Sequence, residues 1–104
     1  LPIGEALLEQ SLVSGIGNVA RSEALFRAHV LPGHRACDLS AAELAAVVLA
    51  AREVMWESYH RGGRWEHRVY QRTGHPCGAC RASSRSARMA PSRRALYYCP
   101  QCQV

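Results

Sequence analysis

The sequence predicts a mainly α-helical fold that carries a small β-hairpin near its C-terminal end. Apolar residues recur at helical spacing over much of residues 1–64. Beyond them, two C-x-x-C pairs enclose eighteen residues. The length agrees with this division, because 104 residues of 48% apolar composition can form one modest core and an appendage that needs its own staple.

Two helices joined by a tight turn are expected at the start of the chain. Residues 3–13 place apolar side chains at helical spacing, and residues 19–29 continue the pattern. Between them, SGIGN (14–18) contains two glycines that favour positive φ, and Asn18 is a good N-cap for the second helix. This arrangement is a helix-turn-helix-like unit.

A connecting loop and a longer helix should follow. Residues 29–39 are expected to form the loop. Ser40 and Glu43 then have the spacing of a capping box, in which each side chain accepts a free N–H group at a helix start. Apolar residues from Leu44 to Met55 recur at i, i+3 and i+4, so we expect residues 41–60 to form an amphipathic helix.

The hydrophobic period changes beyond residue 65. Residues 65–71 are expected to form a short extended segment, and residues 81–98 two short strands joined by a turn. A hairpin of this size with little apolar content is marginal in water, so it needs a staple.

Cysteine spacing supplies that staple. Two pairs separated by eighteen residues match a tetrahedral zinc site with four ligands: Cys77, Cys80, Cys99 and Cys102. Protein would fill all four positions, so the expected zinc ion is structural and not catalytic. Disulfides are the alternative, although an intracellular chain would keep them reduced. His75 could replace one cysteine but fits better as a loop residue, and Cys37 is expected to be buried or inert.

Charge is divided unevenly along the chain. All thirteen basic residues are arginine, which excludes chemistry that needs a lysine amine. Residues 1–66 hold all eight acids beside six arginines, whereas residues 67–104 hold seven arginines and no acid. Five arginines lie between the cysteine pairs, interleaved with serines: Arg81, Arg85, Arg88, Arg93 and Arg94. Such side chains suit phosphate oxygens, so we expect a polyanion such as DNA or RNA as partner. A merely solvated arginine-rich surface is the alternative.

The ends of the chain also carry information. No signal peptide and no apolar run of about 18 residues is present, so we expect a soluble, cytoplasmic protein without a membrane partner. The chain begins with Leu1-Pro2-Ile3 and enters a helical pattern at once, so we expect it to be part of a longer polypeptide.

Four segments carry a specific signature: SGIGNVARSEALFRA (14–28), the capped helix from residue 40, RVYQRTGHPCGAC (68–80) and RALYYCPQCQ (94–103). Together they resemble the C-terminal half of the formamidopyrimidine-DNA glycosylase and endonuclease VIII family, over nearly the whole chain. The resemblance implies a helix-two-turn-helix domain over residues 1–64 and a zinc-finger domain over residues 65–104. In the family these domains clamp damaged double-stranded DNA beside a separate catalytic N-terminal domain, which implies a bacterial protein associated with the nucleoid.

The resemblance also implies where the chain would meet DNA. It places Asn18 on a phosphate, helped by backbone N–H groups near Gly17 at the start of the second helix. Likewise, it places Arg94, beside Arg93, at the finger tip against phosphates that flank a flipped-out nucleotide. A helix N-terminus and an arginine fork both suit phosphate. For Asn18, a plain helix cap is the alternative.

No catalytic residue is expected in this chain. The family attacks the deoxyribose with an N-terminal proline amine and then cleaves the strand by elimination, using residues of its N-terminal domain. Pro2 is not that proline, because it lies in the segment that leads into the first helix. We therefore expect the DNA-clamping half of a bifunctional DNA glycosylase and AP lyase of base excision repair. A stand-alone nucleic-acid or protein adaptor and a purely structural zinc module are the alternatives.

Three features depart from the family pattern. Ala20 stands where a larger residue such as tyrosine is common, which leaves the packing of the second helix open. Arg81 follows Cys80 where a glycine is usual, so the chain must accept a strained turn or adopt another one. The link from Gly63 to Arg68 is shorter than in many relatives, and it leaves the lesion specificity open. The segments DLSAAEL (38–44) and RVYQRTG (68–74) resemble the endonuclease VIII branch of the family slightly more than the other branch.

Overall fold

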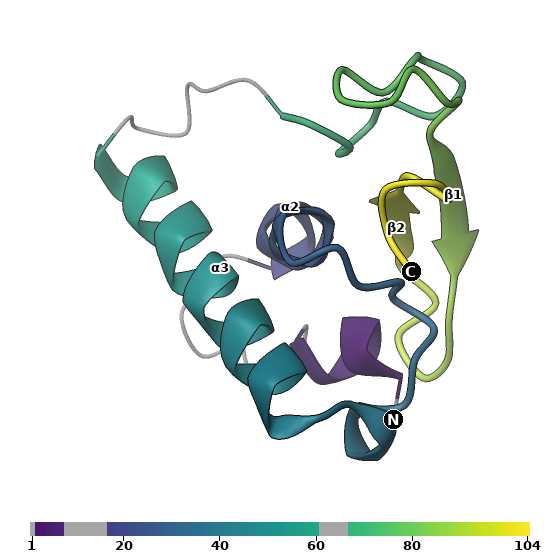
Figure 1. Ribbon diagram of the computed structural model, residues 1–104. Coiled ribbons are helices and arrows are strands. Elements are labelled where there is room, and N and C mark those ends of the chain that lie inside the picture. Colours follow the sequence, from purple (N-terminus) through teal and green to yellow (C-terminus); the bar gives the residue numbers. More distant parts are fainter. Residues whose placement is uncertain (1, 8–16, 61–66) are drawn as a thin grey trace.

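The structure is a computed structural model that describes residues 2–7, 17–60 and 67–104. Its helices and strands, in chain order, are α2 (Gly17–Arg27), the 3-10 helix η1 (Ala36–Asp38), α3 (Ala41–His60), β1 (Arg85–Arg88) and β2 (Ala95–Tyr98). Residues 3–7 are also helical. Figure 1 shows α3 along one side, the β1–β2 hairpin along the opposite side and α2 between them. The predicted fold class, mainly helical with a small hairpin, is confirmed.

The long helix α3 has the predicted bounds, because its start is encoded locally. The Ser40 N–H donates to Glu43 Oε1 at 2.8 Å, and the Glu43 N–H donates to Ser40 Oγ at 3.1 Å, which is the predicted capping box. The helix buries three residues: Val47, Ala50 and Val54. Val48, also part of the apolar pattern, is 48% exposed instead. Among the described residues, none of the helices combines the length and the apolar character needed to cross a membrane.

Small side chains set the packing of α2 on α3. Ala20 and Ala24 of α2 are buried against Ala50 and Val54 of α3. A larger side chain at position 20 would have to displace one of these neighbours, because interiors pack without spare volume. The departure at Ala20 therefore accompanies a close contact between the two helices.

The start of α2 differs slightly from the sequence prediction. The helix begins at Gly17, so Asn18 lies within its first turn and not at the capping position before it. Glycine tolerates helical dihedral angles at a cost of about 1 kcal/mol relative to alanine, which lets the helix extend this far. Residues 14–16 of the predicted turn, and residues 8–13 of the predicted first helix, lie outside the described residues.

The end of α2 also comes earlier than expected, at Arg27. His29 adopts φ of 60°, its N–H donates to the Phe26 carbonyl at 3.1 Å, and the Val30 N–H donates to the Leu25 carbonyl at 3.0 Å. This is the Schellman pattern that closes a helix, and the contact between Leu25 and Val30 that often accompanies it is present. The chain therefore leaves the helix before residue 29.

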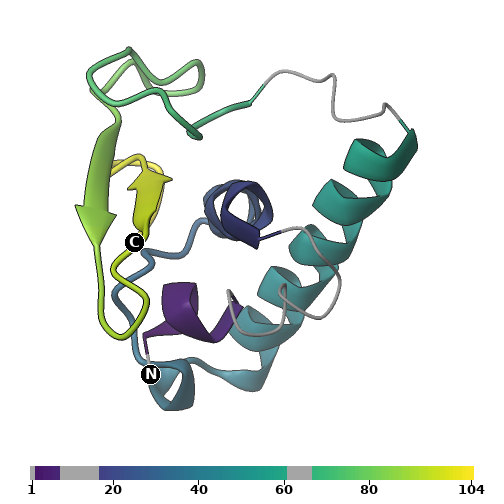
Figure 2. The same cartoon turned by 180° about the vertical axis from the view of Figure 1, so that it is seen from behind.

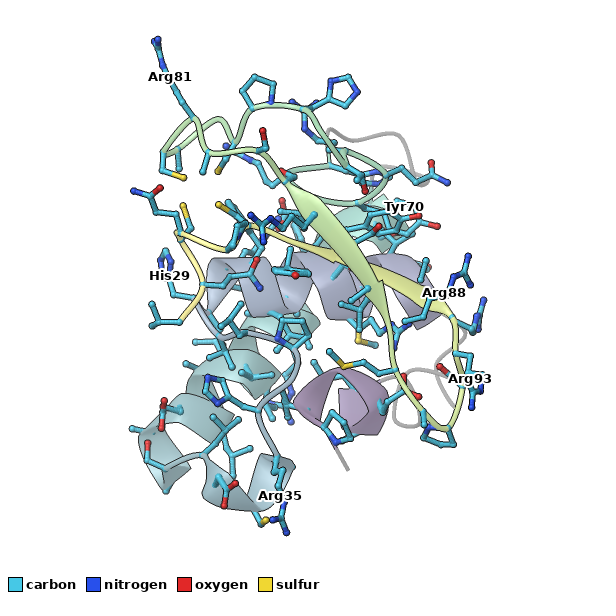
Figure 3. The ribbon with its side chains drawn as sticks, turned by 90° about the vertical axis from the view of Figure 1, so that its right-hand side faces the viewer. His29, Arg35, Tyr70, Arg81, Arg88 and Arg93 are labelled. Carbon is cyan, nitrogen blue, oxygen red and sulfur yellow. The ribbon has the colours of Figure 1, made fainter. Side chains whose placement is uncertain are left out.

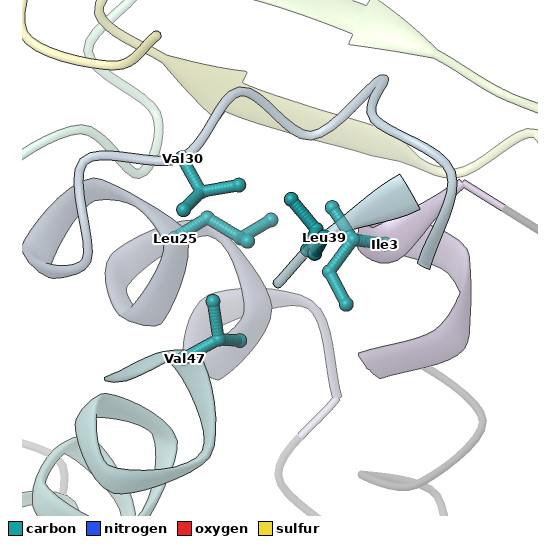
Figure 4. Close-up of a cluster of buried hydrophobic side chains, with 5 residues drawn as sticks. All are labelled: Ile3, Leu25, Val30, Leu39 and Val47. Carbon is teal, nitrogen blue, oxygen red and sulfur yellow. The ribbon is translucent and has the colours of Figure 1, made fainter. Parts of the chain in front are cut away.

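The main core lies where four segments converge. Five buried residues from the first helical segment, α2, the following loop and α3 form one cluster (Figure 4): Ile3, Leu25, Val30, Leu39 and Val47. Burying each such side chain contributes roughly 1.5–3 kcal/mol. The connecting loop over residues 29–39 thus contributes two anchors to the core.

The extended segment predicted over residues 65–71 is wrong where the structure describes it. Residues 68–71 form bends and turns, and Gln71 has φ of 56°. Three consecutive N–H groups converge on the Glu23 carboxylate: those of Arg68, Val69 and Tyr70. Successive N–H groups of a strand point to opposite sides, so this convergence requires a turn. Residues 65 and 66 lie outside the described part.

The predicted hairpin is confirmed. β1 and β2 are antiparallel, with Arg85 opposite Tyr98 and Arg88 opposite Ala95. β2 packs closely on the first helical segment: a Cβ atom at Gly4 would lie 3.1 Å from Leu96 Cδ2. Seen from behind in Figure 2, helical residues 3–7 lie between α3 and the turn of the hairpin. The absence of a side chain at Gly4 is what permits this approach.

Candidate metal centre and the arginine-rich hairpin

Four cysteines come together beyond the end of α3. The Sγ atoms of Cys77, Cys80, Cys99 and Cys102 all lie within 4.8 Å of one another. The Sγ–Sγ distances across the pairs are 3.7 Å for Cys77–Cys102 and 3.4 Å for Cys80–Cys99. These distances are too long for disulfide bonds, whose sulfurs are about 2.05 Å apart. None of the five cysteines, all of which lie in the described residues, forms a disulfide bond.

The spacing of the sulfurs fits a tetrahedral metal ion. A zinc ion with Zn–S bonds of about 2.3 Å holds its four sulfurs roughly 3.8 Å apart, within the observed range. Four sulfur ligands favour zinc among the common structural ions, and a closed set of four leaves no position for a substrate. The four cysteines therefore form a structural zinc site, as the spacing of the sequence predicted.

Backbone N–H groups prepare the sulfurs for a metal. Burial raises the pKa of the Cys77 thiol, but N–H groups of Cys80 and Ala79 donate to its sulfur and, with its cysteine neighbours, lower that pKa to about 7. The Cys102 N–H donates to Cys99 Sγ at 3.4 Å. Hydrogen bonding to Cys80, and then burial, raise the pKa of Cys102. The four sulfurs cannot all ionise unless a cation offsets their mutual repulsion.

The turn after the first cysteine pair is strained. Arg81 has φ of 66°, and its N–H donates to the Cys77 carbonyl at 2.7 Å. An arginine at this position was expected either to accept a strained turn or to adopt a different one. The chain adopts the strained, left-handed turn, which a glycine would take at lower cost. Figure 3 shows the Arg81 side chain extending into solvent, at the opposite end of the hairpin from Arg93.

The second cysteine pair is joined to the core by Gln103. Its amide oxygen accepts the Cys99 N–H at 2.7 Å, and its Nε2 donates to the Val30 carbonyl at 2.8 Å. The side chain is fully buried. Gln103 thus links the metal centre to the segment that closes α2.

Two other candidate ligands stay outside the centre. His75 is exposed in a loop, as predicted, and does not belong to the sulfur cluster. Cys37 lies in η1 and is exposed, so of the expectation that it is buried or inert the first part is wrong, and the second stays a prediction. The 3-10 turn that contains Cys37 buries none of its three residues.

The arginines of the hairpin have no acidic partners among the described residues. All five arginines between the cysteine pairs are exposed, and none of the five forms an ion pair with a described carboxylate. They are Arg81, Arg85, Arg88, Arg93 and Arg94. An arginine-rich surface without carboxylates keeps its positive potential, which suits an anionic partner.

The hairpin tip, residues 89–94, holds its backbone firmly. Arg93 has φ of 58°, and its N–H donates to the Met89 carbonyl at 2.7 Å. Arg88 Nη1 donates to the Arg93 carbonyl at 2.9 Å. Figure 3 places Arg88 and Arg93 together at this end of the hairpin. The two tip arginines predicted as DNA contacts, Arg93 and Arg94, therefore project from an ordered loop.

The other two predicted DNA contacts, Gly17 and Asn18, lie in the first turn of α2. An unpaired helix start offers free N–H groups and the positive end of the helix dipole. The same helix reaches the hairpin farther along. Three consecutive buried residues of α2, Arg21, Ser22 and Glu23, each bind backbone of residues 68–97.

These three residues were missed by sequence reasoning. Ser22 Oγ accepts the Tyr97 N–H at 3.1 Å, and Arg21 and Glu23 are almost wholly buried. Charged residues on a helix ordinarily mark its solvated face. Because α2 is covered on several sides, its charges turn inward to backbone groups distant in sequence, which no local pattern indicates.

Comparison with known proteins identifies a family model and relatives that match this chain. Residues 1–67 match the family model described as the formamidopyrimidine-DNA glycosylase H2TH domain. The chain is 36% identical to formamidopyrimidine-DNA glycosylase of Ruegeria pomeroyi and 38% identical to that of Cereibacter sphaeroides, with 98% of this chain covered in each case. It spans only 42% of the length of either relative.

Solved structures agree with the fold. The MutM (Fpg) protein of Thermus thermophilus superposes with a TM-score of 0.87 at 33% identity, covering 98% of this chain and 44% of that protein. Lactococcus lactis Fpg in complex with DNA that contains an abasic site gives a TM-score of 0.88 at 28% identity, covering 99% and 42%. Both superpositions include the helices and the finger.

Proposed function

The chain belongs to the formamidopyrimidine-DNA glycosylase family, and from that premise we propose that it is the DNA-clamping half of a bifunctional DNA glycosylase and AP lyase. It would grip phosphates around a damaged nucleotide in double-stranded DNA during base excision repair, at the bacterial nucleoid. The structures that it resembles include MutM bound to DNA with carbocyclic 8-oxo-G and Fpg bound to abasic-site DNA.

One observation carries the proposal: exposed arginines that form no ion pair with any described carboxylate project from a hairpin tip whose backbone is ordered. Arg93 and Arg94 are both exposed at this tip. An arginine fork binds phosphate oxygens bidentately, and a fixed backbone reduces the entropy lost on binding. The zinc site supports the same role, because it closes the other end of the hairpin without offering a reactive position.

A second contact would come from the start of α2. We assign a DNA phosphate to the Asn18 side chain and to N–H groups at Gly17 and its neighbours, where the helix dipole favours an anion. Together with Arg94, this contact would hold the DNA backbone at two places. A kinked duplex with an extruded nucleotide needs such support, because unstacking costs energy that phosphate contacts offset.

Excision chemistry would fall to residues outside this chain. The Pro2 nitrogen lies in a peptide bond with Leu1, so in this chain it is an amide nitrogen and not a free amine. We propose that the chain contributes binding and that a separate N-terminal domain contributes catalysis.

A salt titration tests the proposal. Binding to a duplex that carries a tetrahydrofuran abasic-site analogue would be measured by fluorescence anisotropy for the parent, Asn18→Ala and Arg94→Ala. We expect each variant to bind roughly 5- to 150-fold more weakly, and Arg94→Ala to lower the slope of log Kd against log salt by about 1. Zinc content and circular dichroism would establish that each variant is folded.

Arg35→Ala is the matched control, because it removes the same charge from an exposed arginine. Figure 3 shows Arg35 well away from Arg93 and the tip. At physiological salt a charge beyond about 8 Å contributes little, so this variant should bind much as the parent does. Equal binding by all four proteins would reject the clamp and favour the adaptor role instead.

A further inference from the structure

A buried ion pair connects the first helical segment and α2 to the hairpin tip. Arg21 Nη1 lies 2.7 Å from Glu5 Oε2, and the two side chains are 0% and 2% exposed. The second guanidinium nitrogen, Nη2, donates to the carbonyls of Arg94 at 2.9 Å and Ala95 at 3.4 Å. Glu5 in turn accepts the N–H of Ser92 at 2.6 Å and its hydroxyl at 2.9 Å. A single pair thus holds four polar groups at the tip and the start of β2.

Stability alone does not account for this pair. Removing two charges from water costs much of what their attraction returns, and apolar residues of similar volume often stabilise a core at least as well. The pair instead provides directional hydrogen bonds, because each of its oxygens and nitrogens has fixed hydrogen-bond geometry. The pair therefore specifies where the tip backbone lies.

The contacts at the tip complement one another. Arg88 binds the carbonyl of Arg93, so the carbonyls of residues 93, 94 and 95 are each bound by a guanidinium group. Ser92 Oγ also accepts the Arg94 N–H at 3.2 Å. With these backbone groups occupied, the tip keeps one arrangement while the Arg93 and Arg94 side chains stay exposed.

The same ion pair reaches the second proposed phosphate contact. Arg21 lies three residues after Asn18 on α2, about one helical turn from the start of the helix. Displacing Arg21 would shift the tip relative to that start. The two proposed contacts are therefore joined through one rigid helix and one ion pair.

We propose that Glu5 and Arg21 are positioning residues that fix the distance between the hairpin tip and the start of α2, so that two phosphate groups of DNA are met at a preset spacing. This inference rests on the proposed function and extends it to residues that would not touch DNA. Positioning of this kind preorganises the protein, because the tip is ordered before binding and less entropy is lost when the complex forms.

A double-mutant cycle tests the inference. Glu5→Gln keeps the size of the side chain and removes its charge. We expect it to weaken binding to the abasic-site duplex at least about fivefold in the parent, and less than about twofold when Arg93 and Arg94 are both alanine. The salt slope of Glu5→Gln should equal that of the parent, because no phosphate contact is removed. Equal weakening in both backgrounds would overturn the inference, since the effect would not act through the tip.

Hydrogen exchange in the free protein gives a readout independent of DNA. Glu5→Gln should raise amide exchange of residues 92–95 about tenfold or more without changing exchange in α3. Ser92→Ala is a milder variant that leaves the ion pair intact, and it should raise exchange over the same residues. The control is Glu43→Gln, an exposed carboxylate at the start of α3, which should leave the tip unchanged. Unaltered exchange at the tip in Glu5→Gln would refute the positioning role.

The two hypotheses fail differently. If the parent does not bind DNA, the proposed function is rejected, and tip exchange alone decides whether the pair orders the tip. If the parent binds and Arg94→Ala weakens it, but Glu5→Gln does not, the clamp stands and the positioning role is rejected.

Discussion

Glu23 offers a direct test of how the segment after α3 is attached to α2. The side chain is fully buried. Its Oε1 accepts the Arg68 N–H at 2.8 Å, and its Oε2 accepts those of Val69 and Tyr70 at 2.8 Å and 3.0 Å. Glutamine has one oxygen in place of two, so Glu23→Gln can keep at most two of these bonds. The amide NH₂ group would then face the third N–H group, donor against donor.

The magnitude follows from the bonds lost. A hydrogen bond to a charged group contributes about 1.5–3 kcal/mol, and a neutral one about 1 kcal/mol. Losing one bond outright costs about 1.5–3 kcal/mol, and losing the charge from the other two costs at least about 0.5 kcal/mol each, so the free energy of unfolding should fall by about 2.5–4 kcal/mol or more. For a domain of this size, that is a fall in Tm of roughly 10–25 °C.

Urea denaturation of the zinc-loaded protein, followed by far-ultraviolet circular dichroism, measures this change. Amide exchange of residues 68–70 reports the attachment itself. Glu53→Gln is the matched control: it makes the same substitution in a carboxylate 55% exposed and 4.0 Å from Arg27, where less than about 1 kcal/mol is expected. If both variants unfold at the same urea concentration and residues 68–70 stay protected, Glu23 is not the anchor.

Three further predictions concern the metal, a strained residue and pH. Chelating the zinc should lower the Tm and expose the four thiols to a thiol reagent while most helical dichroism persists; unchanged thiol reactivity would contradict the metal site. Arg81→Gly should stabilise the protein by up to about 1 kcal/mol in urea denaturation, because relief of a left-handed φ outweighs the greater freedom of glycine in the unfolded chain; a loss of stability would show that the turn is not left-handed. Burial acts to raise the pKa of Glu5, but bonds from Ser92 and Arg21 outweigh it and hold that pKa below its ordinary value of 4.5. The contribution of Glu5 to stability is therefore present above pH 4.5 and lost as the pH falls below it, so Glu5→Gln should flatten the fall of Tm between about pH 5 and 3, and equal slopes would contradict the reasoning.

Features encoded in short stretches of sequence were predicted well. The bounds of α3 follow from Ser40 and Glu43, three residues apart, whose reciprocal bonds need no other part of the chain. The metal site follows in the same way, because the turn within each C-x-x-C pair sets two sulfurs in position. The hairpin between the pairs is then nearly obligatory, since eighteen residues must return the chain to the same ion.

Features that depend on distant contacts were missed. His29 closes α2 in a conformation that glycine usually marks, so the sequence contains no signal for the helix end. Residues 68–71 turn because the N–H groups of residues 68–70 reach Glu23, more than forty positions earlier. The burial of Arg21 depends on Glu5 and on tip carbonyls, and neither partner can be located before the hairpin is placed.

The direction of the hairpin has a different origin from its shape. Zinc ligation can shape the hairpin, because it brings the two cysteine pairs together around one ion. It does not fix the orientation of the hairpin relative to the helices. That relation comes from α2, whose consecutive residues Arg21, Ser22 and Glu23 bind three separate parts of the following segment. Polar contacts of this kind cross the boundary predicted between residues 64 and 65, which remains a prediction. A clamp needs both elements, since a well-formed hairpin that could swing freely would present Arg94 to no fixed phosphate.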